Sequence, residues 1–149
     1  MNCVVFDTSI LTYVFKASLE DKIIREKVDL LLKKLEKKGV KIVIPTPVLT
    51  EILQLIGTDG ESIEKITKNS QFKIAPFDYK ASVECAILCK EINKDNDKIG
   101  QKQKLKFDMQ IVAIAKSIGC SIIYSNDEHI FKRCKDLGIK VVGINDLEL

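Results

Sequence analysis

The sequence predicts an α/β fold, a single domain over residues 1–149 with a central, mostly parallel sheet covered by helices on both faces. Short runs rich in β-branched residues recur along the chain, which is typical of strands buried on both faces. Amphipathic helical patterns separate these runs. No repeat, low-complexity tract or long linker divides the 149 residues. Strands that alternate with helices imply right-handed crossovers and hence a parallel sheet.

Four strands are predicted from the β-branched runs, and a weaker run gives a fifth. They lie at residues 2–6, 41–44, 121–124 and 139–142, with 72–76 as the weaker candidate. The expected sheet therefore has four to five strands.

Six helices are predicted between the strands, at residues 20–38, 46–56, 61–69, 78–92, 106–118 and 127–137. Glycines mark three of their ends, at Gly39, Gly119 and Gly138. For the second helix we expect Thr46 as the N-cap and Pro47 in the first turn.

Composition excludes several classes of protein. No apolar run approaches the roughly 20 residues that a bilayer span needs, and the first residues do not resemble a secretory signal, so we expect a cytoplasmic protein. Five cysteines, an odd number, then predict reduced thiols. Cys85 and Cys89 lie one helical turn apart, but no nearby His or Cys pair completes a zinc site, which favours buried small hydrophobic residues.

The net charge of +3 is too small to prove a nucleic-acid partner, but residues 98–106 read KIGQKQKLK, with four lysines and no acid. A solvated loop is one interpretation of this run. The other is a lip that faces the phosphates of a nucleic acid. The lysines concerned are Lys98, Lys102, Lys104 and Lys106.

Four acids are expected at one edge of the sheet. Asp7 and Asp127 each follow a predicted strand, and Glu51 lies just over one turn into the helix after residues 41–44. Asp108 is expected to open the helix that leads back to residues 121–124. In open α/β sheets, ligands bind beyond the carboxyl ends of the strands, so these carboxylates should converge on a ligand site.

Asp108 is the most informative acid, because its helical neighbours Ile111, Val112 and Ala115 are all apolar. An acid on a core-facing stripe is costly to bury without a partner. Mg²⁺ or Mn²⁺ would relieve the repulsion among four carboxylates, whereas a single histidine serves zinc poorly. A cation held in this way can activate water for hydrolysis of a phosphodiester.

Each acid also has a purely structural interpretation. Asp7 and Asp127 could be helix N-caps, Glu51 a solvated helix residue and Asp108 a first-turn acid. If Asp7 binds metal, we expect Thr8 or Ser9 to take over its capping role. The hydroxyls of Thr8, Ser9 and Ser125 are expected either to support the site or to be turn residues, and His129 is expected to be a surface or packing residue rather than a catalytic one.

Three segments, FDTSIL, PTPVLTEIL and FDMQIVAIAKSIGCSIIYSNDEHIF, resemble in order the acidic motifs of PIN-domain nucleases, including VapC-type toxins. The resemblance implies a three-layer α/β/α sandwich, often a homodimer, with Mg²⁺- or Mn²⁺-dependent endoribonuclease activity on RNA. It further implies a role in RNA processing or as a toxin with an antitoxin protein as partner. Asn126 and His129 fall in a variable part of the last motif. The positions that match are the metal-binding acids Asp7, Glu51, Asp108 and Asp127 and the supporting hydroxyls Ser9 and Ser125.

Two alternatives stay open. The first is a non-catalytic RNA- or protein-binding module that keeps the acids for folding. The second is a phosphatase or phosphotransferase with Asp7 as the nucleophile. The sequence disfavours this second alternative, because Ser9 stands where a second aspartate would be needed.

Overall fold

In this computed structural model of the protein, residues 2–15, 21–92 and 99–147 are described. They form a five-stranded sheet in the order β3-β2-β1-β4-β5, and every neighbouring pair of strands is parallel. The predicted α/β fold is confirmed, including the weaker fifth strand. The strands are β1 (Cys3–Phe6), β2 (Lys41–Pro45), β3 (Phe72–Ala75), β4 (Ile122–Tyr124) and β5 (Lys140–Val142).

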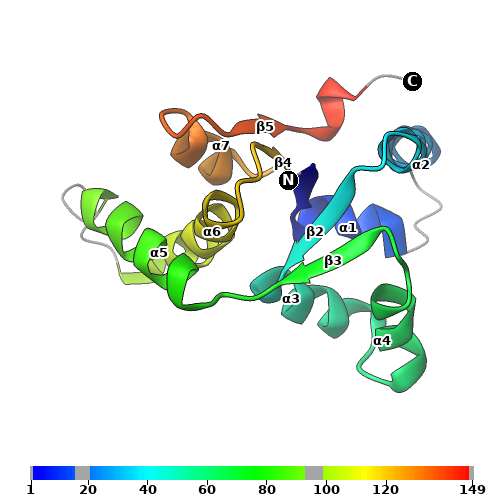
Figure 1. The fold of residues 1–149 in the computed structure, drawn as a ribbon, viewed down its shortest axis with the longest axis horizontal. Coiled ribbons are helices and arrows are strands. Elements are labelled where there is room, and N and C mark those ends of the chain that lie inside the picture. Colours follow the sequence, from blue (N-terminus) through cyan, green and yellow to red (C-terminus); the bar gives the residue numbers. More distant parts are fainter. Residues whose placement is uncertain (1, 16–20, 93–98, 148–149) are drawn as a thin grey trace.

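Helices cover both faces of the sheet (Figure 1). On one face lie α1 (Thr8–Phe15), α2 (Lys22–Lys37), α3 (Thr46–Ile56) and α4 (Gly60–Thr67), and on the other α5 (Tyr79–Ile92), α6 (Ile99–Ser117) and α7 (Glu128–Cys134). A short 3₁₀ helix, η1 (Ile144–Asp146), follows β5. In the described part of the chain, no helix is long and apolar enough to cross a membrane.

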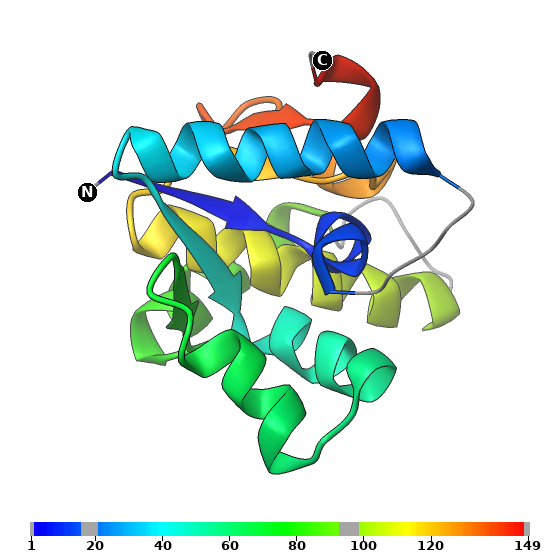
Figure 2. The same ribbon diagram turned by 90° about the vertical axis from the view of Figure 1, so that its right-hand side faces the viewer.

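The core is built around the central strand β1. Val5 and Phe6 are fully buried, and in α6 the predicted stripe of Ile111, Val112 and Ala115 is buried as well. Burial of each large aliphatic or aromatic side chain of this kind contributes about 1.5–3 kcal/mol relative to exposure. Figure 2 shows α2 running antiparallel to β1, and α1 and α3 starting at the tips of β1 and β2. Helices α1 and α3 therefore begin at the same edge of the sheet.

Helix α1 was not predicted. Its eight residues, TSILTYVF, are mostly apolar, so no amphipathic period marks them. The side chain of Asp7 accepts a hydrogen bond from the backbone N–H of Ile10, and the backbone carbonyl of Asp7 accepts one from Leu11. The expectation that the capping role passes from Asp7 to Thr8 or Ser9 is therefore wrong.

Helix α6 begins at Ile99 rather than near residue 106. The interpretation of the lysine-rich run as a loop is wrong for residues 99–106, since lysine and glutamine are good helix formers. Asp108 consequently lies in the middle of α6 and does not open it. The end of this helix was predicted correctly, with Gly119 at a φ of 74° just after it.

Thr46 does not cap α3. The N-cap position is taken by Pro45, and no side chain caps this helix. The Thr46 hydroxyl instead accepts a hydrogen bond from the backbone N–H of Phe77, at 3.1 Å. The predicted cap is wrong because a partner distant in sequence binds the hydroxyl.

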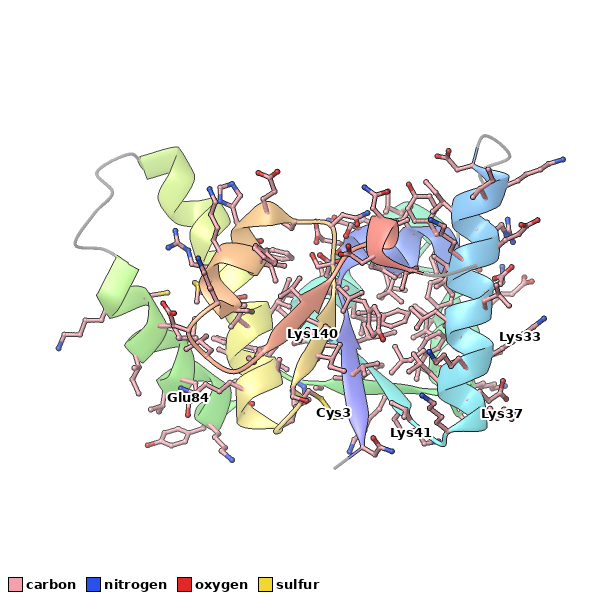
Figure 3. All side chains as sticks on the ribbon, turned by 90° about the horizontal axis from the view of Figure 1, so that it is seen from above. Cys3, Lys33, Lys37, Lys41, Glu84 and Lys140 are labelled. Atoms are coloured by element: carbon pink, nitrogen blue, oxygen red, sulfur yellow. A yellow bond between two sulfur atoms is a disulfide. The ribbon has the colours of Figure 1, made fainter. Side chains whose placement is uncertain are left out.

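Cys3 and Cys120 form a disulfide, which corrects the prediction that all thiols are reduced. It joins the first residue of β1 to the segment just before β4, and Figure 3 shows Cys3 at the end of the molecule where the strands begin. Nothing in the spacing of these cysteines, 117 residues apart, signals a bond. Cys85 is buried and Cys89 partly buried, as expected of small apolar residues.

Candidate active site

The centre of the candidate site is Asp7, which follows β1 directly and is only 4% exposed. One carboxylate oxygen accepts a hydrogen bond from the Ser9 hydroxyl at 2.6 Å and one from the Ile10 amide at 3.3 Å. The other oxygen accepts a hydrogen bond from the Ser125 hydroxyl, at the end of β4. The side chain is therefore fixed by three donors from two neighbouring strand ends.

Burial raises the pKa of the Asp7 carboxyl above its ordinary value of 3.8. The hydrogen bonds from Ser125, Ser9 and Ile10 favour the charged form and oppose this rise, while the nearby charge of Asp127 adds to it. The net effect is a carboxylate whose negative charge is destabilised by its surroundings. Such a group gains most from a cation.

Glu51 reaches the site from the second turn of α3, the helix that starts at the carboxyl end of β2. Its Oε1 accepts a hydrogen bond of 2.6 Å from the Thr8 hydroxyl, at the start of α1. Thr8 and Ser9 thus orient two different acids, Glu51 and Asp7, from consecutive positions.

Asp127 combines two roles in the loop after β4. Its Oδ1 accepts a hydrogen bond of 2.8 Å from the His129 amide, which makes it the N-cap of α7. Its own amide donates to the Ser125 hydroxyl at 2.9 Å, and the Asn126 amide donates to the Ser9 hydroxyl at 3.0 Å. Ser9 and Ser125 each bind both Asp7 and this loop, which couples the ends of β1 and β4.

Asp108 projects from the middle of α6 and is only 3% exposed. Its helical neighbours Ile111 and Val112 belong to the core, as the sequence predicted. A carboxylate at this depth is surrounded by a medium in which charge is poorly solvated.

All four acids line one cavity of about 600 Å³, although they come from four separate segments of the chain. Within the described residues, no three His, Cys, Asp or Glu side chains are arranged so that they could hold a metal ion as they stand. The structure therefore brings the acids to one cavity without gathering them at one point. The cavity lining is Asp7, Thr8, Ser9, Glu51, Phe107, Asp108, Ile111, Asn126, Asp127 and Ile130.

The chemistry of these donors fits a hard divalent cation. The titratable groups in the lining are all carboxylates, which suit Mg²⁺ and Mn²⁺, and no lining residue is a histidine or cysteine. The hydroxyls of Thr8, Ser9 and Ser125 already orient Glu51 and Asp7. The assignment of the four acids as ligands stays a prediction.

Sequence reasoning missed four residues that line the cavity: Phe107, Ile111, Asn126 and Ile130. Ile111 and Ile130 each stand three positions after an acid of the site, so helical spacing could have found them. Asn126 gave no such signal; its side-chain oxygen accepts a hydrogen bond from the Ile144 amide at 2.8 Å. His129 is exposed, as predicted.

The predicted basic lip stays untested. Lys98 lies outside the described residues. Lys102, Lys104 and Lys106 belong to α6, but their side chains also lie outside the description.

Comparisons with known proteins agree on the family. The PIN domain family matches residues 4–137. The VapBC2 structure from Rickettsia felis, bound to a DNA fragment from its promoter, has a TM-score of 0.66 and 18% identity, and the match covers 95% of this chain and 98% of that chain. DNA-bound VapBC from Salmonella typhimurium has a TM-score of 0.61 and 18% identity, with coverages of 97% and 99%. No curated protein matches the sequence. A buried aspartate after β1, with the family match over nearly the whole fold, identifies this chain as a member of the PIN domain family.

Proposed function

We propose that the protein is an endoribonuclease that depends on Mg²⁺ or Mn²⁺ and hydrolyses phosphodiester bonds of RNA. The observation that carries this proposal is the shared cavity of Asp7, Glu51, Asp108 and Asp127, two of which are buried. Four carboxylates around one cavity repel one another unless a cation neutralises them. Members of the PIN domain family are generally nucleases and typically use divalent metal ions, which supports the same conclusion.

Asp7, Glu51, Asp108 and Asp127 would hold the cation. When bound, it supplies charge neutralisation at the phosphate and a water of lowered pKa. Ser9 and Ser125 keep the Asp7 carboxylate in place through hydrogen bonds to its two oxygens. Thr8 does the same for Glu51. Because these donors come from the protein, little reorganisation is needed when substrate binds.

Cleavage of RNA by purified protein tests the proposal. We expect single-stranded RNA to be cut with Mg²⁺ or Mn²⁺ and not with EDTA, and we expect Asp7→Asn and Asp108→Asn each to lower the rate by more than about a hundredfold. Circular dichroism checks that both variants fold.

Asp136→Asn is the matched control. Asp136 is an exposed aspartate that does not line the cavity, so its variant should cut RNA at the wild-type rate. Undiminished cleavage by Asp7→Asn would overturn the mechanism. Absence of cleavage by the wild type, together with RNA binding, would favour the non-catalytic alternative.

We further propose that the nuclease is the toxin of a toxin–antitoxin pair. The proposal is supported by the two solved structures, which are VapBC complexes bound to DNA and match nearly the full length of this chain. Expression of the protein alone should arrest growth, and Asp7→Asn should relieve the arrest. Co-expression of a small protein encoded beside it should relieve the arrest of the wild type, and normal growth on expression would argue against the toxin role.

A further inference from the structure

The cavity is much larger than a metal site requires. A water molecule in the liquid occupies about 30 Å³, so a cation with six waters would fill on the order of 200 Å³. The cavity measures about 600 Å³. Most of the cavity volume is therefore left for substrate. The chemistry of the lining residues indicates which part of the substrate binds there.

The lining contains two chemically different groups of residues. The apolar group, called the apolar side below, consists of Phe107, Ile111 and Ile130. The polar group consists of Asp7, Thr8, Ser9, Glu51, Asp108, Asn126 and Asp127.

The apolar side is linked to the acids by helix geometry. In α6, Ile111 stands three positions after Asp108, and in α7, Ile130 stands three positions after Asp127. Residues three apart lie on the same face of a helix, so Ile111 lies on the face of α6 that carries Asp108. Asp127 is the N-cap of α7, and Ile130 lies in the first turn of that helix. Both isoleucines are only 1% exposed and so belong to the inner wall. Phe107 is partly exposed, and the rest of its side chain packs against the core.

We propose that this apolar side binds a nucleobase of single-stranded RNA next to the phosphodiester that is cut, with the base packed against the ring of Phe107. The inference rests on the proposed function. Sugar and phosphate are polar, and the base is the flat, weakly polar part of a nucleotide that suits an aromatic ring beside two isoleucines. Duplex RNA keeps its bases stacked inside the helix, so an unpaired base is required.

Fluorescence of 2-aminopurine tests base packing without cleavage. Single-stranded RNA that carries one 2-aminopurine, moved through the sequence in a series of oligonucleotides, is titrated with Asp7→Asn protein in Mg²⁺. At one position the fluorescence should change on binding, because the base leaves its stacked neighbours. Phe107→Trp in the same background should still give a change at that position, and Phe107→Leu should remove most of it and weaken binding about tenfold.

Phe131→Leu is the control, because Phe131 is a 57% exposed aromatic residue of α7 that does not line the cavity. Its variant should bind as the Asp7→Asn protein does. In the protein that retains Phe107, an abasic site at the sensitive position should weaken binding of the oligonucleotide by the same factor of about ten. In the Phe107→Leu variant, the abasic site should weaken binding no further. Equal binding of the abasic and intact oligonucleotides would overturn the proposal.

Cleavage separates this inference from the nuclease proposal. With otherwise wild-type protein, Phe107→Leu should raise the KM for a mapped single-stranded substrate about tenfold and leave kcat nearly unchanged. Cleavage that is unaffected by Phe107→Leu and by the abasic substitution would leave the nuclease intact and overturn base packing. Base-dependent binding without any cleavage would support the base site and count against the nuclease.

Discussion

Strands β1 and β4 are connected at both ends, by opposite kinds of chemistry. At their carboxyl ends the connection is a hydrogen bond from Ser125 to the buried carboxylate of Asp7. Where the strands begin, the connection is the disulfide between Cys3 and Cys120. One end contains a carboxyl group whose pKa is raised by burial, and the other contains a covalent bond.

The same contrast extends to the charged residues around the two ends. Lys37 and Lys41 are exposed near Cys3, and Figure 3 shows the three residues at the same end of the molecule. The Lys41 ammonium group donates a hydrogen bond to the Ser70 carbonyl, so a charge serves the fold there. At the carboxyl end, Asp7 and Asp108 are buried acids within one cavity. Burial of acidic side chains is unfavourable for stability, and it occurs here at the end that carries the candidate site, as is usual for functional sites.

Loss of the disulfide should have the largest effect on stability. It closes a loop with a sequence separation of 117 residues, for which chain entropy predicts about 4–5 kcal/mol. Cys120→Ala should therefore lower the midpoint of thermal unfolding by more than about 10 °C. Cleavage well below the new midpoint should stay at the wild-type rate, because the cavity lies at the other end of the strands.

Dithiothreitol provides the control for that prediction. It should lower the midpoint of the wild type and leave Cys120→Ala unchanged. Thiol titration of the unfolded, unreduced protein should find Cys85, Cys89 and Cys134 alone. If all five cysteines titrate as thiols, the disulfide is absent and no covalent bond connects the strands where they begin.

The charge of Asp7 should appear in the pH dependence of stability. Burial raises its pKa above the 3.8 expected of an unfolded aspartate, so ionisation is less favourable in the folded protein. Below pH 3.8 this group therefore does not reduce the free energy of unfolding. The free energy of unfolding falls as the pH rises from 3.8 through the higher, folded-state pKa. In EDTA, Asp7→Asn should be more stable than the wild type at neutral pH, by an amount that shrinks toward low pH.

Urea denaturation at a series of pH values measures this difference. Mg²⁺ should reverse it at neutral pH, because a cation that binds only the folded wild type stabilises that protein alone. An Asp7→Asn variant that is less stable than the wild type at neutral pH in EDTA would show that the hydrogen bonds from Ser9 and Ser125 outweigh burial.

The fold and the placement of the acids around one cavity could be predicted from sequence because local patterns encode both. The β-branched run before Asp7 is typical of a buried strand, and parallel strands bring their following residues to one edge. Apolar neighbours marked Asp108 as a buried acid although its position in α6 was wrong. Fold and burial were thus predictable where sequence position and side-chain type sufficed.

Features that depend on tertiary contacts could not be predicted. The disulfide pairs residues 117 apart, a proximity that only the completed sheet creates. The hydrogen bond between Thr8 and Glu51 likewise joins two helices with no sequence relation.

Asp127 offers a way to separate capping from charge within one residue. Asp127→Asn keeps a side-chain oxygen for the His129 amide and should leave stability nearly unchanged, whereas Asp127→Ala removes the cap of α7 and should cost about 1 kcal/mol. Both variants remove a charge from the cavity, so both should lose cleavage. Equal stabilities of the two variants in urea would show that the cap contributes nothing.

The smallest expected effect is at Thr8. Thr8→Val keeps the shape of the side chain but removes the hydrogen bond of 2.6 Å to Glu51, which should cost about 0.5–1 kcal/mol in urea denaturation. Thr50→Val is the matched control, because the exposed Thr50 hydroxyl only bonds back to the Thr46 carbonyl of its own helix. If Thr8 serves to orient Glu51, Thr8→Val should also raise the Mg²⁺ concentration needed for half-maximal cleavage, and Thr50→Val should not. If Thr8→Val loses stability but keeps the Mg²⁺ dependence of the wild type, Thr8 stabilises the fold, as the disulfide does, and does not orient Glu51 for metal binding.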